Sequence, residues 1–372
     1  MDVRNRLSEL RQRRGLSVAD LASRAGIRRQ TIYAIEAHRY IPNTVVALRL
    51  AQILEVRVED LFSITTPAPA AQEPTPVDLL SVPAASGQPY QPVRLAKVGR
   101  HLVAVPSEPV LGEIPAADAI VMGHSRGGKT LVRPIRGEAD AQDRLIIAGC
   151  DPAMPMLARQ LRKQSNVELI IVMCSSRQAL KWLGERRIHI AGTHLSGKSG
   201  GASNLEVIRS LLPGRGVRVV TFASWEEGLV VAAANPKGIS GVGDLVRPEV
   251  TIVNREIGAG ARLLLDTALK SEGISPASVH GYDQTAAGHV MAAWHVWSGK
   301  ADCCIATRAA ARVLGLHFLP LAGERYDLVI PERCFDLPAV QSVLDTLNRA
   351  SFRSELEALG GYDTSQTGRL VS

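Results

Sequence analysis

The stretch LSVADLASRAGIRRQTIYAIEAHRYIP, residues 16–42, decides the fold of the N-terminal end of the chain. The Ser17 hydroxyl is placed to accept a free backbone N–H at the start of a helix, and Asp20 is placed to accept from the Ser17 backbone in return. Gly26 allows the left-handed backbone of a tight turn, after which apolar residues resume at helical spacing. Two short helices joined by such a turn predict a helix-turn-helix.

The second helix of this pair has an apolar face and a polar face. Ile27, Ile32 and Ile35 alternate towards the interior, and arginine, glutamine and tyrosine residues lie near the N-terminal, outward side. Arg and Gln side chains make bidentate contacts to guanine and adenine edges in the major groove. We therefore expect this surface to bind double-stranded DNA through Arg28, Arg29, Gln30, Thr31, Tyr33 and Arg39.

Apolar residues at helical spacing continue around this pair and predict a compact, all-helical domain over residues 1–65. The Pro-rich run SITTPAPAAQEPTPVD follows Leu61-Phe62 and cannot bury a core, so residues 66–89 are predicted to be a linker. Residues 90–140 alternate in short apolar pieces separated by Gly, Pro and Ser, which favours a small β-rich segment. From Arg144 onward strand-then-helix units predict an α/β domain over residues 141–372.

Composition narrows the classes of function. Residues 1–65 carry 11 Arg and no Lys against 7 Asp or Glu, so much of the chain's net charge of +7 lies at the predicted DNA-binding end. Aromatic residues make up only 4% of the chain, which disfavours an aromatic platform for single-stranded nucleic acid.

The five cysteines show no C-x-x-C spacing, so neither a disulfide framework nor a metal site is expected. No apolar signal segment or membrane-length run is present, and we expect a cytoplasmic protein with no membrane partner.

The segment GHSRGGKT, residues 123–130, matches the phosphate-binding pattern G-x-x-x-x-G-K-[ST]. That motif requires a helix to start at its lysine, because the helix N-terminus helps to hold the phosphates. The residues after Lys129 alternate like a strand, and Pro134 would break a helix in its second turn. A turn between two strands is therefore favoured over a nucleotide site.

The first domain resembles the Cro/CI-type, XRE family of helix-turn-helix regulators from LRQRRG to VEDLF, residues 10–62. The resemblance implies an ion pair between Arg11 and Glu36, which assigns both residues to structure. Val18 stands where the family commonly has a phosphate-contacting Gln. The alternative is a helical protein-interaction module of the same fold, with Arg28, Arg29 and Arg39 simply solvated.

The second half resembles the type II periplasmic-binding-protein-like domain of the molybdate-binding class. The stretches AGCDPAMPMLARQL, HIAGTHL, ANPKGISGVGDL, NREIGAGARLLLD and ADCCIATRAAARVLGLHFLPLAGERYDLVIP carry this resemblance. It implies two α/β lobes with a ligand between them, residues 144–230 and about 325–372 in one lobe and about 231–324 in the other. The chain would cross between the lobes near GLVVAAANP and near ERYDLVIP.

Strand ends and helix starts supply the candidate ligand site. Hydroxyls and backbone amides at Ser175-Ser176, and amides at the turn Gly258-Ala259-Gly260, can donate to a small anion at a helix N-terminus. Ala259 and Ala261 stand where the family often has Ser and Thr, so two hydroxyl donors are missing. For His194 a structural role and a ligand contact are both open, and Tyr326 could close over the ligand or pack at the hinge. The predicted ligand-binding residues are Ser175, Ser176, Thr193, His194, Gly258, Ala259, Gly260, Arg262 and Tyr326.

No catalytic residue is predicted, because Cys150-Asp151 follows a strand without an identifiable partner in the sequence. The sequence thus predicts a multidomain, non-enzymatic transcriptional regulator with no cofactor. Its effector is expected to be a small anion such as molybdate or tungstate, and two copies are expected to bind DNA as a homodimer. Two alternatives stay open: an NTP-dependent DNA-binding protein that uses residues 123–130, and a cytoplasmic small-molecule-binding protein whose first domain contacts protein.

Overall fold

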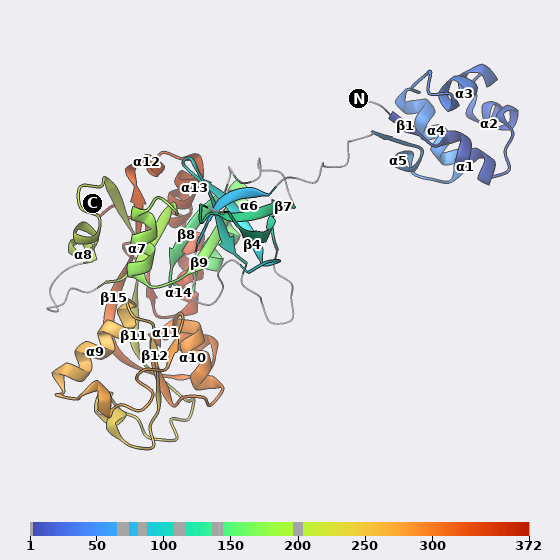
Figure 1. The fold of residues 1–372 in the computed structure, drawn as a ribbon. Coiled ribbons are helices and arrows are strands. Elements are labelled where there is room, and N and C mark those ends of the chain that lie inside the picture. The colour runs from blue at the N-terminus through green and yellow to red at the C-terminus, as the bar shows by residue number, and fades with distance from the viewer. Residues whose placement is uncertain are drawn as a thin grey trace. The chain divides into compact units, whose positions relative to one another are not determined.

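Two compact units make up the chain, Met1–Gln72 and Glu73–Ser372, and each is described by itself. The computed structural model describes residues 3–64, 74–80, 88–107, 116–125, 127–135, 141, 144–195 and 204–371. Figure 1 labels the helices and strands in chain order. Among these described residues, no helix is both long and apolar enough to span a bilayer.

The first unit folds around the predicted helix-turn-helix, which is confirmed. The backbone N–H of Asp20 donates to the Ser17 hydroxyl, and the Ser17 N–H donates to the Asp20 carboxylate, both at 3.1 Å. Gly26 ends that helix with a φ of +67°. The helices are α1 (Leu7–Arg13), α2 (Val18–Ala25), α3 (Arg29–Glu36), α4 (Thr44–Leu54) and α5 (Val58–Leu61).

A short antiparallel ribbon of β1 (Val3–Asn5) and β2 (Phe62–Ile64) closes this unit. Val3 falls within residues 1–65, which the sequence predicted to be all-helical, but it lies in the ribbon. The Asn5 side chain accepts the Leu7 N–H at 2.8 Å, so the first helix begins only at Leu7. The first unit is therefore helical with one small β element.

The ion pair between Arg11 and Glu36 is confirmed. The guanidinium donates to both carboxylate oxygens, at 2.6 and 3.0 Å, and a third bond at 3.0 Å goes to the Leu16 carbonyl. The two side chains are only 12% and 11% exposed. The pair ties α1 to α3, which leaves the N-terminal face of α3 available for other contacts.

The second unit begins with a closed barrel of five strands in the order β3-β5-β4-β6-β7. The strands are β3 (Thr75–Leu79), β4 (Pro92–Val98), β5 (His101–Pro106), β6 (Ala119–His124) and β7 (Thr130–Pro134). The first of them lies within the range predicted as linker, residues 66–89. Its sequence TPVDL is short and contains a proline, which hides the strand pattern.

The structure around Lys129 differs from that of a phosphate-binding loop. Strand β7 follows Lys129 directly, as the sequence pattern predicted, so no helix starts there. The Ser125 N–H donates to the Lys129 carbonyl at 2.8 Å, which closes a turn between β6 and β7. The Lys129 ammonium pairs with Asp78 on β3. This lysine therefore stabilises the barrel.

A nine-stranded sheet runs through the rest of the unit, with the path β13-β12-β14-β11-β15-β10-β8-β9 and with β16 paired to β11. Lobe I contains β8 (Arg144–Gly149), β9 (Glu168–Met173), β10 (Ile190–Thr193), α6 (Met154–Ser165), α7 (Ser176–Gly184), α8 (Asn204–Leu211), α12 (Glu332–Phe335), α13 (Pro338–Leu347), α14 (Ala350–Leu359) and β16 (Tyr362–Asp363). Lobe II contains β12 (Ile252–Arg255), α9 (Gly260–Ser271), β13 (Thr285–Ala286), α10 (His289–Trp297), β14 (Cys303–Thr307) and α11 (Arg308–Val313).

Two long antiparallel strands join the lobes, β11 (Val217–Val231) and β15 (His317–Pro331). They pair from Val217–Pro331 in lobe I to Val231–His317 in lobe II, with register shifts at Thr221/Ala223 and Glu227/Gly228. Figure 1 shows both strands running between the green and red upper lobe and the orange lower lobe. The predicted two-lobed α/β fold is confirmed, and the two crossings fall where they were expected.

The barrel packs against lobe I through a shared apolar core and an ion network. Barrel residues such as Val98 and Val105 join one cluster with Ile146 and Trp182 of lobe I. Asp118 accepts from Arg94 at 3.0 Å and pairs with Arg144 at 2.8 Å, and both arginines also pair with Glu168 at 2.6 Å. The side chains of Arg144 and Asp118 are 6% and 5% exposed. The barrel is thus fixed to lobe I by buried charge as well as by apolar contact.

Candidate functional site

The predicted DNA-binding residues lie at the exposed face of α3. Arg28 is the N-cap residue of this helix, Tyr33 is 56% exposed, and Arg39 lies just beyond the helix C-terminus. Ile32 and Ile35, on the opposite face, are fully buried. Arg29 and Gln30 are also exposed, and Thr31 is half-buried. DNA contact by these six residues stays a prediction.

Several predicted ligand residues come together where the two lobes meet. A Cβ atom on Gly258 of lobe II would lie 3.2 Å from the Ser175 hydroxyl of lobe I. A Cβ atom on Gly260 would lie 2.4 Å from Cε1 of His194. The Ser176 hydroxyl accepts the His194 N–H at 3.2 Å, so this serine positions the histidine. The helix N-termini of α7 and α9 therefore face one another around His194.

Three of the four other predicted ligand residues already have structural contacts. Thr193 donates to Asn204 at 3.1 Å, and Arg262 donates to the Arg255 carbonyl at 3.1 Å while stacking on the Tyr282 ring. The Tyr326 hydroxyl accepts the Cys150 N–H at 3.1 Å and is fully buried. Ala259 is the N-cap of α9, where its side chain makes no capping bond. Their roles in ligand binding stay predictions.

A cluster of buried polar side chains surrounds His194; we call it the inter-lobe cluster. Lobe I contributes groups from the carboxyl ends of β8 and β10, lobe II contributes the end of β12 and the start of α10, and the crossing strands contribute two carboxylates and an indole. The carboxyl ends of parallel strands are where α/β sheets bind ligands. The members are Cys150, Asp151, His194, Trp225, Glu227, Arg255, His289 and Glu324.

His194 lies at the centre of a chain of hydrogen bonds. Its Nε2 atom is 3.1 Å from the Cys150 sulfur, and its Nδ1 atom is 2.5 Å from the Glu324 carboxylate. Glu227 places Oε1 3.5 Å from His194 Nδ1 and also 3.5 Å from His289 Nε2. Of these five residues, only Glu324 has a side chain with appreciable exposure, 9%. The cluster is thus a buried, polar centre between the lobes.

Many polar atoms of this cluster have no hydrogen-bond partner among the described residues. They are both carboxylate oxygens of Glu227, both ring nitrogens of His289, the indole N–H of Trp225, Nη1 of Arg255 and Oδ2 of Asp151. Each buried polar atom without a partner costs about 1–3 kcal/mol. Such a concentration of unpartnered groups is typical of a site that a ligand completes.

Burial sets the protonation states in the cluster. It raises the pKa of Glu227 to about 8, helped by the nearby Glu324 carboxylate, and raises the pKa of Asp151 to about 7. Burial, together with the positive charge of Arg255, lowers the pKa of His289 well below its usual range. Burial also opposes charge on His194, but Cys150 and Glu227 outweigh it and raise its pKa well above the usual range.

This arrangement has two possible chemical uses. An imidazole between a thiol and a carboxylate can activate the thiol as a nucleophile. The same imidazole, held by the carboxylate through Nδ1, can bind a metal ion through Nε2. Cys150, which the sequence left without a partner, therefore has one in His194. That the protein is not an enzyme stays a prediction.

Sequence reasoning missed most of the inter-lobe cluster, although two signals were present. Glu226-Glu227 and the charged residues of ERYD interrupt long apolar strands, which is unusual unless the charges are needed there. Arg255 ends the apolar run TIVNR in the same way as Ser175 follows its strand. His289, the first residue of α10, gave no comparable signal.

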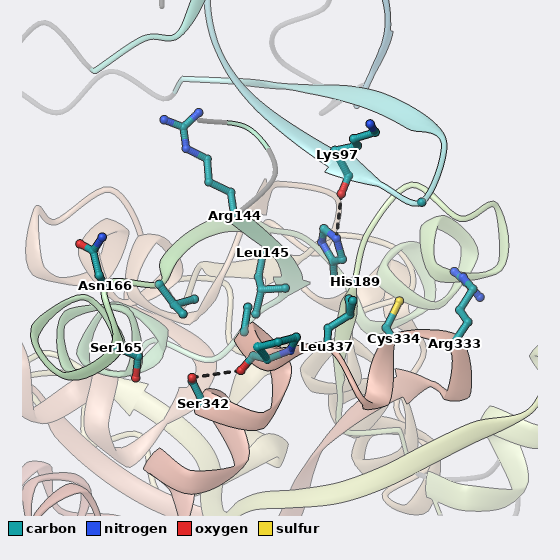
Figure 2. Close-up of a pocket in the computed structure, with 14 residues that line it drawn as sticks. Lys97, Arg144, Leu145, Ser165, Asn166, His189, Arg333, Cys334, Leu337 and Ser342 are labelled. Carbon is teal, nitrogen blue, oxygen red and sulfur yellow. Dashed lines mark hydrogen bonds between the residues drawn. The ribbon is translucent and has the colours of Figure 1, made fainter. Parts of the chain in front are cut away.

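A hollow of about 600 Å³ lies where the barrel meets lobe I, away from the inter-lobe cluster. Figure 2 shows His189 between the Lys97 carbonyl and residues Leu337 and Cys334, with the Arg144 side chain extending away from them. None of the described residues that line this hollow is acidic. His189 and Arg144 already have hydrogen-bond partners, so the inter-lobe cluster is the better candidate for a ligand.

His189 predicts a pH dependence for the barrel junction. Its Nδ1 atom accepts the Ile146 N–H at 2.9 Å and its other nitrogen lies 3.1 Å from the Lys97 carbonyl, which requires the neutral ring. Burial lowers the pKa of His189 to about 4. Its stabilising contribution is therefore complete above pH ~6.5 and is lost as the pH falls towards ~4, by about 3 kcal/mol.

Urea unfolding of the wild type and a His189→Gln variant between pH 7.5 and 4 measures this contribution. The difference in unfolding free energy between the two proteins should shrink as the pH falls. A difference that does not change with pH would show that the ring is not held neutral in the folded state.

Both units of the chain match known protein families. The model of a helix-turn-helix domain matches residues 5–64, and that of the PBP superfamily domain matches residues 158–348. The Bacillus subtilis (strain 168) protein named "Uncharacterized protein YvgK" is 32% identical over 234 residues, 63% of this chain and 75% of that protein. The "Uncharacterized HTH-type transcriptional regulator YgzD" of the same organism is 37% identical over 60 residues, 16% of this chain and 91% of that protein.

Solved structures with a similar fold include a tungstate ABC transporter protein from Geobacter sulfurreducens, with a TM-score of 0.43 and 16% identity over 56% of this chain and 95% of that chain. The sulfate-binding protein SubI from Mycobacterium tuberculosis H37Rv has a TM-score of 0.43 and 13% identity over 59% and 86% of the two chains. The superfamily match covers just over half of the 372 residues, and YvgK is matched over three quarters of its length. This protein therefore belongs to the PBP superfamily, with a helix-turn-helix domain at its N-terminal end.

Proposed function

We propose that this protein is a transcriptional regulator that binds double-stranded DNA through α3 and responds to a small ligand held between lobes I and II. The observation that carries the proposal is the inter-lobe cluster, whose unpartnered polar atoms lie between two lobes in a chain with a helix-turn-helix domain. Relatives named as HTH-type transcriptional regulators support the DNA-binding half. We infer that the ligand is bound and released unchanged, and that the protein works in the cytoplasm.

The ligand would act by favouring one arrangement of the lobes. It shifts that equilibrium only by its difference in affinity for the two arrangements. Ser175, Ser176, Gly258 and Gly260 lie at the helix N-termini beside the cluster, which supports an oxyanion such as molybdate or tungstate. Glu227 and Glu324 oppose it when they are ionised, because a buried dianion beside charged carboxylates is repelled. An oxyanion is therefore one of two ligand classes to test.

We further propose that two copies bind DNA together. One helix-turn-helix reaches a single major-groove segment, whereas a dyad-related pair reads two half-sites about 34–36 Å apart. The expected footprint on a mapped operator therefore covers two half-sites, and light scattering should give the mass of a dimer. A monomer that protects one half-site would contradict this part of the proposal.

The DNA-binding part of the proposal is tested by removing a side chain that is expected to read a base. Arg28→Ala and Gln30→Ala should each weaken operator binding by about 1–3 kcal/mol and relax the preference at one base pair. Arg57→Ala is the matched control, because Arg57 is a 79% exposed arginine at the N-cap of α5. Titration of labelled operator and of random DNA with the three variants gives the affinities. Unaltered operator affinity in both α3 variants would mean that another surface reads the DNA.

A further inference from the structure

We propose that the inter-lobe cluster is a binding site for a soft divalent transition-metal ion, such as Zn²⁺, with Cys150, His194 and His289 as ligands and with the Glu227 carboxylate beside the two histidines. The proposal rests on the proposed function, because it names the ligand class of the same site. The first observation is distance: one donor atom from each of Cys150, His194 and His289 lies within 4.8 Å of the other two. A tetrahedral Zn²⁺ site separates its nitrogen and sulfur ligands by about 3.3–3.6 Å.

The orientation of His194 is the second observation. Glu324 lies 2.5 Å from Nδ1, so Nδ1–H donates to the carboxylate, and the other ring nitrogen, Nε2, faces the Cys150 sulfur at 3.1 Å, where a metal ion would replace any proton on Nε2. Metal-binding histidines are commonly held in this way by a carboxylate on the other ring nitrogen. Glu324 thus acts as a positioning residue for the metal ligand. Small outward shifts of the sulfur and the ring would open the space for the ion.

The third observation concerns His289 and Glu227, which a thiol nucleophile would not use. Both His289 nitrogens and both Glu227 oxygens are fully buried without hydrogen-bond partners among the described residues. A metal ion bound to one His289 nitrogen would satisfy that atom, and its positive charge would stabilise the carboxylate of Glu227, which lies 3.5 Å from His289 Nε2. It would also explain why two histidines from different lobes lie with ring centroids 5.7 Å apart.

Charge favours a cation over an anion. When ionised, the Cys150 thiolate and the carboxylates of Glu227 and Glu324 offer three negative charges to a divalent ion. The buried Arg255 is already paired with Glu256 at 2.9 and 3.0 Å. Buried charges are tolerated when they are compensated or bind a metal, and a dianion here would add repulsion. A thiolate with imidazoles selects Zn²⁺, Cu or Co²⁺ over Mg²⁺ or Ca²⁺.

Metal binding is measured on the full chain with ZnCl₂ by equilibrium dialysis and with CoCl₂ by absorption. We expect one ion per chain and a thiolate-to-Co²⁺ charge-transfer band. Cys150→Ser should lose the band, and Cys150→Ser and His289→Gln should each lower Zn²⁺ affinity by at least about 100-fold, with a decrease of about 10–100-fold for Glu324→Gln. The matched controls are Cys334→Ser, a buried cysteine on α12, and His295→Gln, on the same helix as His289.

A Cys150→His variant keeps the measurement decisive if Cys150→Ser misfolds. It supplies a nitrogen donor and should recover Zn²⁺ binding without the charge-transfer band. The site is overturned by absence of Zn²⁺ and Co²⁺ binding, by equal affinity in wild type, Cys150→Ser and His289→Gln, or by molybdate binding that these two substitutions abolish. If the protein gives a footprint that depends on Arg28 but binds no metal, only the metal site is contradicted. If it binds metal but its affinity for the operator does not change, only the proposed regulation is contradicted.

Discussion

A Gly260→Ala variant should lose the contact between the lobes while each lobe stays folded. The added Cβ would lie 2.4 Å from Cε1, 2.5 Å from Nδ1 and 2.5 Å from the carbonyl oxygen of His194, closer than packed atoms approach. Alanine suits the first residue of α9 better than glycine does, so the helix itself is not weakened. The clash can be relieved only by moving α9 of lobe II away from His194 of lobe I.

Hydrogen exchange by mass spectrometry measures this separation without a ligand. Amides around residues 192–195 and 256–263 should exchange about tenfold faster or more in Gly260→Ala than in the wild type. Zn²⁺ affinity, where it is observed, should fall in parallel because His194 and His289 lie in different lobes. Gly241→Ala is the matched control, since Gly241 is also in lobe II, has extended backbone and meets nothing within 4 Å. Equal exchange in the two variants would mean that the lobes do not stay together in solution.

Removing the Arg144 side chain should destabilise the second unit by about 3–5 kcal/mol. Arg144 is 5% exposed and pairs with Asp118 and Glu168, while its Nη1 also donates to the Leu95 carbonyl at 3.1 Å. Without the arginine, Asp118 stays buried with less compensation, although Arg94 still pairs with it. The loss is large because the charge that is left behind cannot reach water.

Chemical unfolding of Arg144→Ala and Arg159→Ala compares the loss of unfolding free energy at a buried arginine with the loss at an exposed one. Arg159 pairs with Glu355 at the surface, with side chains 69% and 34% exposed, so its removal should cost about 0–1 kcal/mol. A loss below about 1 kcal/mol in Arg144→Ala would show that the network between barrel and lobe I contributes little. Both variants lose one arginine and therefore have the same net charge.

Elements with a strong periodic pattern or a capping signal could be predicted from the sequence. Ser17, Asp20 and Gly26 specify the helix-turn-helix through local hydrogen bonds, and the strand-then-helix units specify the two lobes. Strand β3 could not be predicted in the same way, because its place in the barrel depends on pairing with β5 and β7 about 25 and 55 residues later. The five residues of β3 are too few to show a clear alternation of apolar and polar side chains.

The candidate site also contains residues that local sequence signals revealed and residues that only the tertiary structure brings in. His194, Ser175 and Gly260 were found because they follow strands or start helices, which is a local signal. Glu227 and His289 enter the site through tertiary structure: Glu227 lies at a register shift of β11, and His289 comes from the other lobe. A β-bulge redirects side chains, and single-sequence periodicity does not reveal where one occurs.

The position of β15 in the sheet has a consequence for synthesis on the ribosome. In lobe I this strand lies between β10 and β11, although these are translated about 135 and 110 residues earlier. Until β15 emerges, β10 and β11 have no neighbour on their facing edges, and unpaired strand edges attract other chains. Lobe II places β15 at the edge of its sheet, so most of its strands can pair first. Vectorial folding should therefore complete the inserted lobe before the lobe that precedes it in the chain.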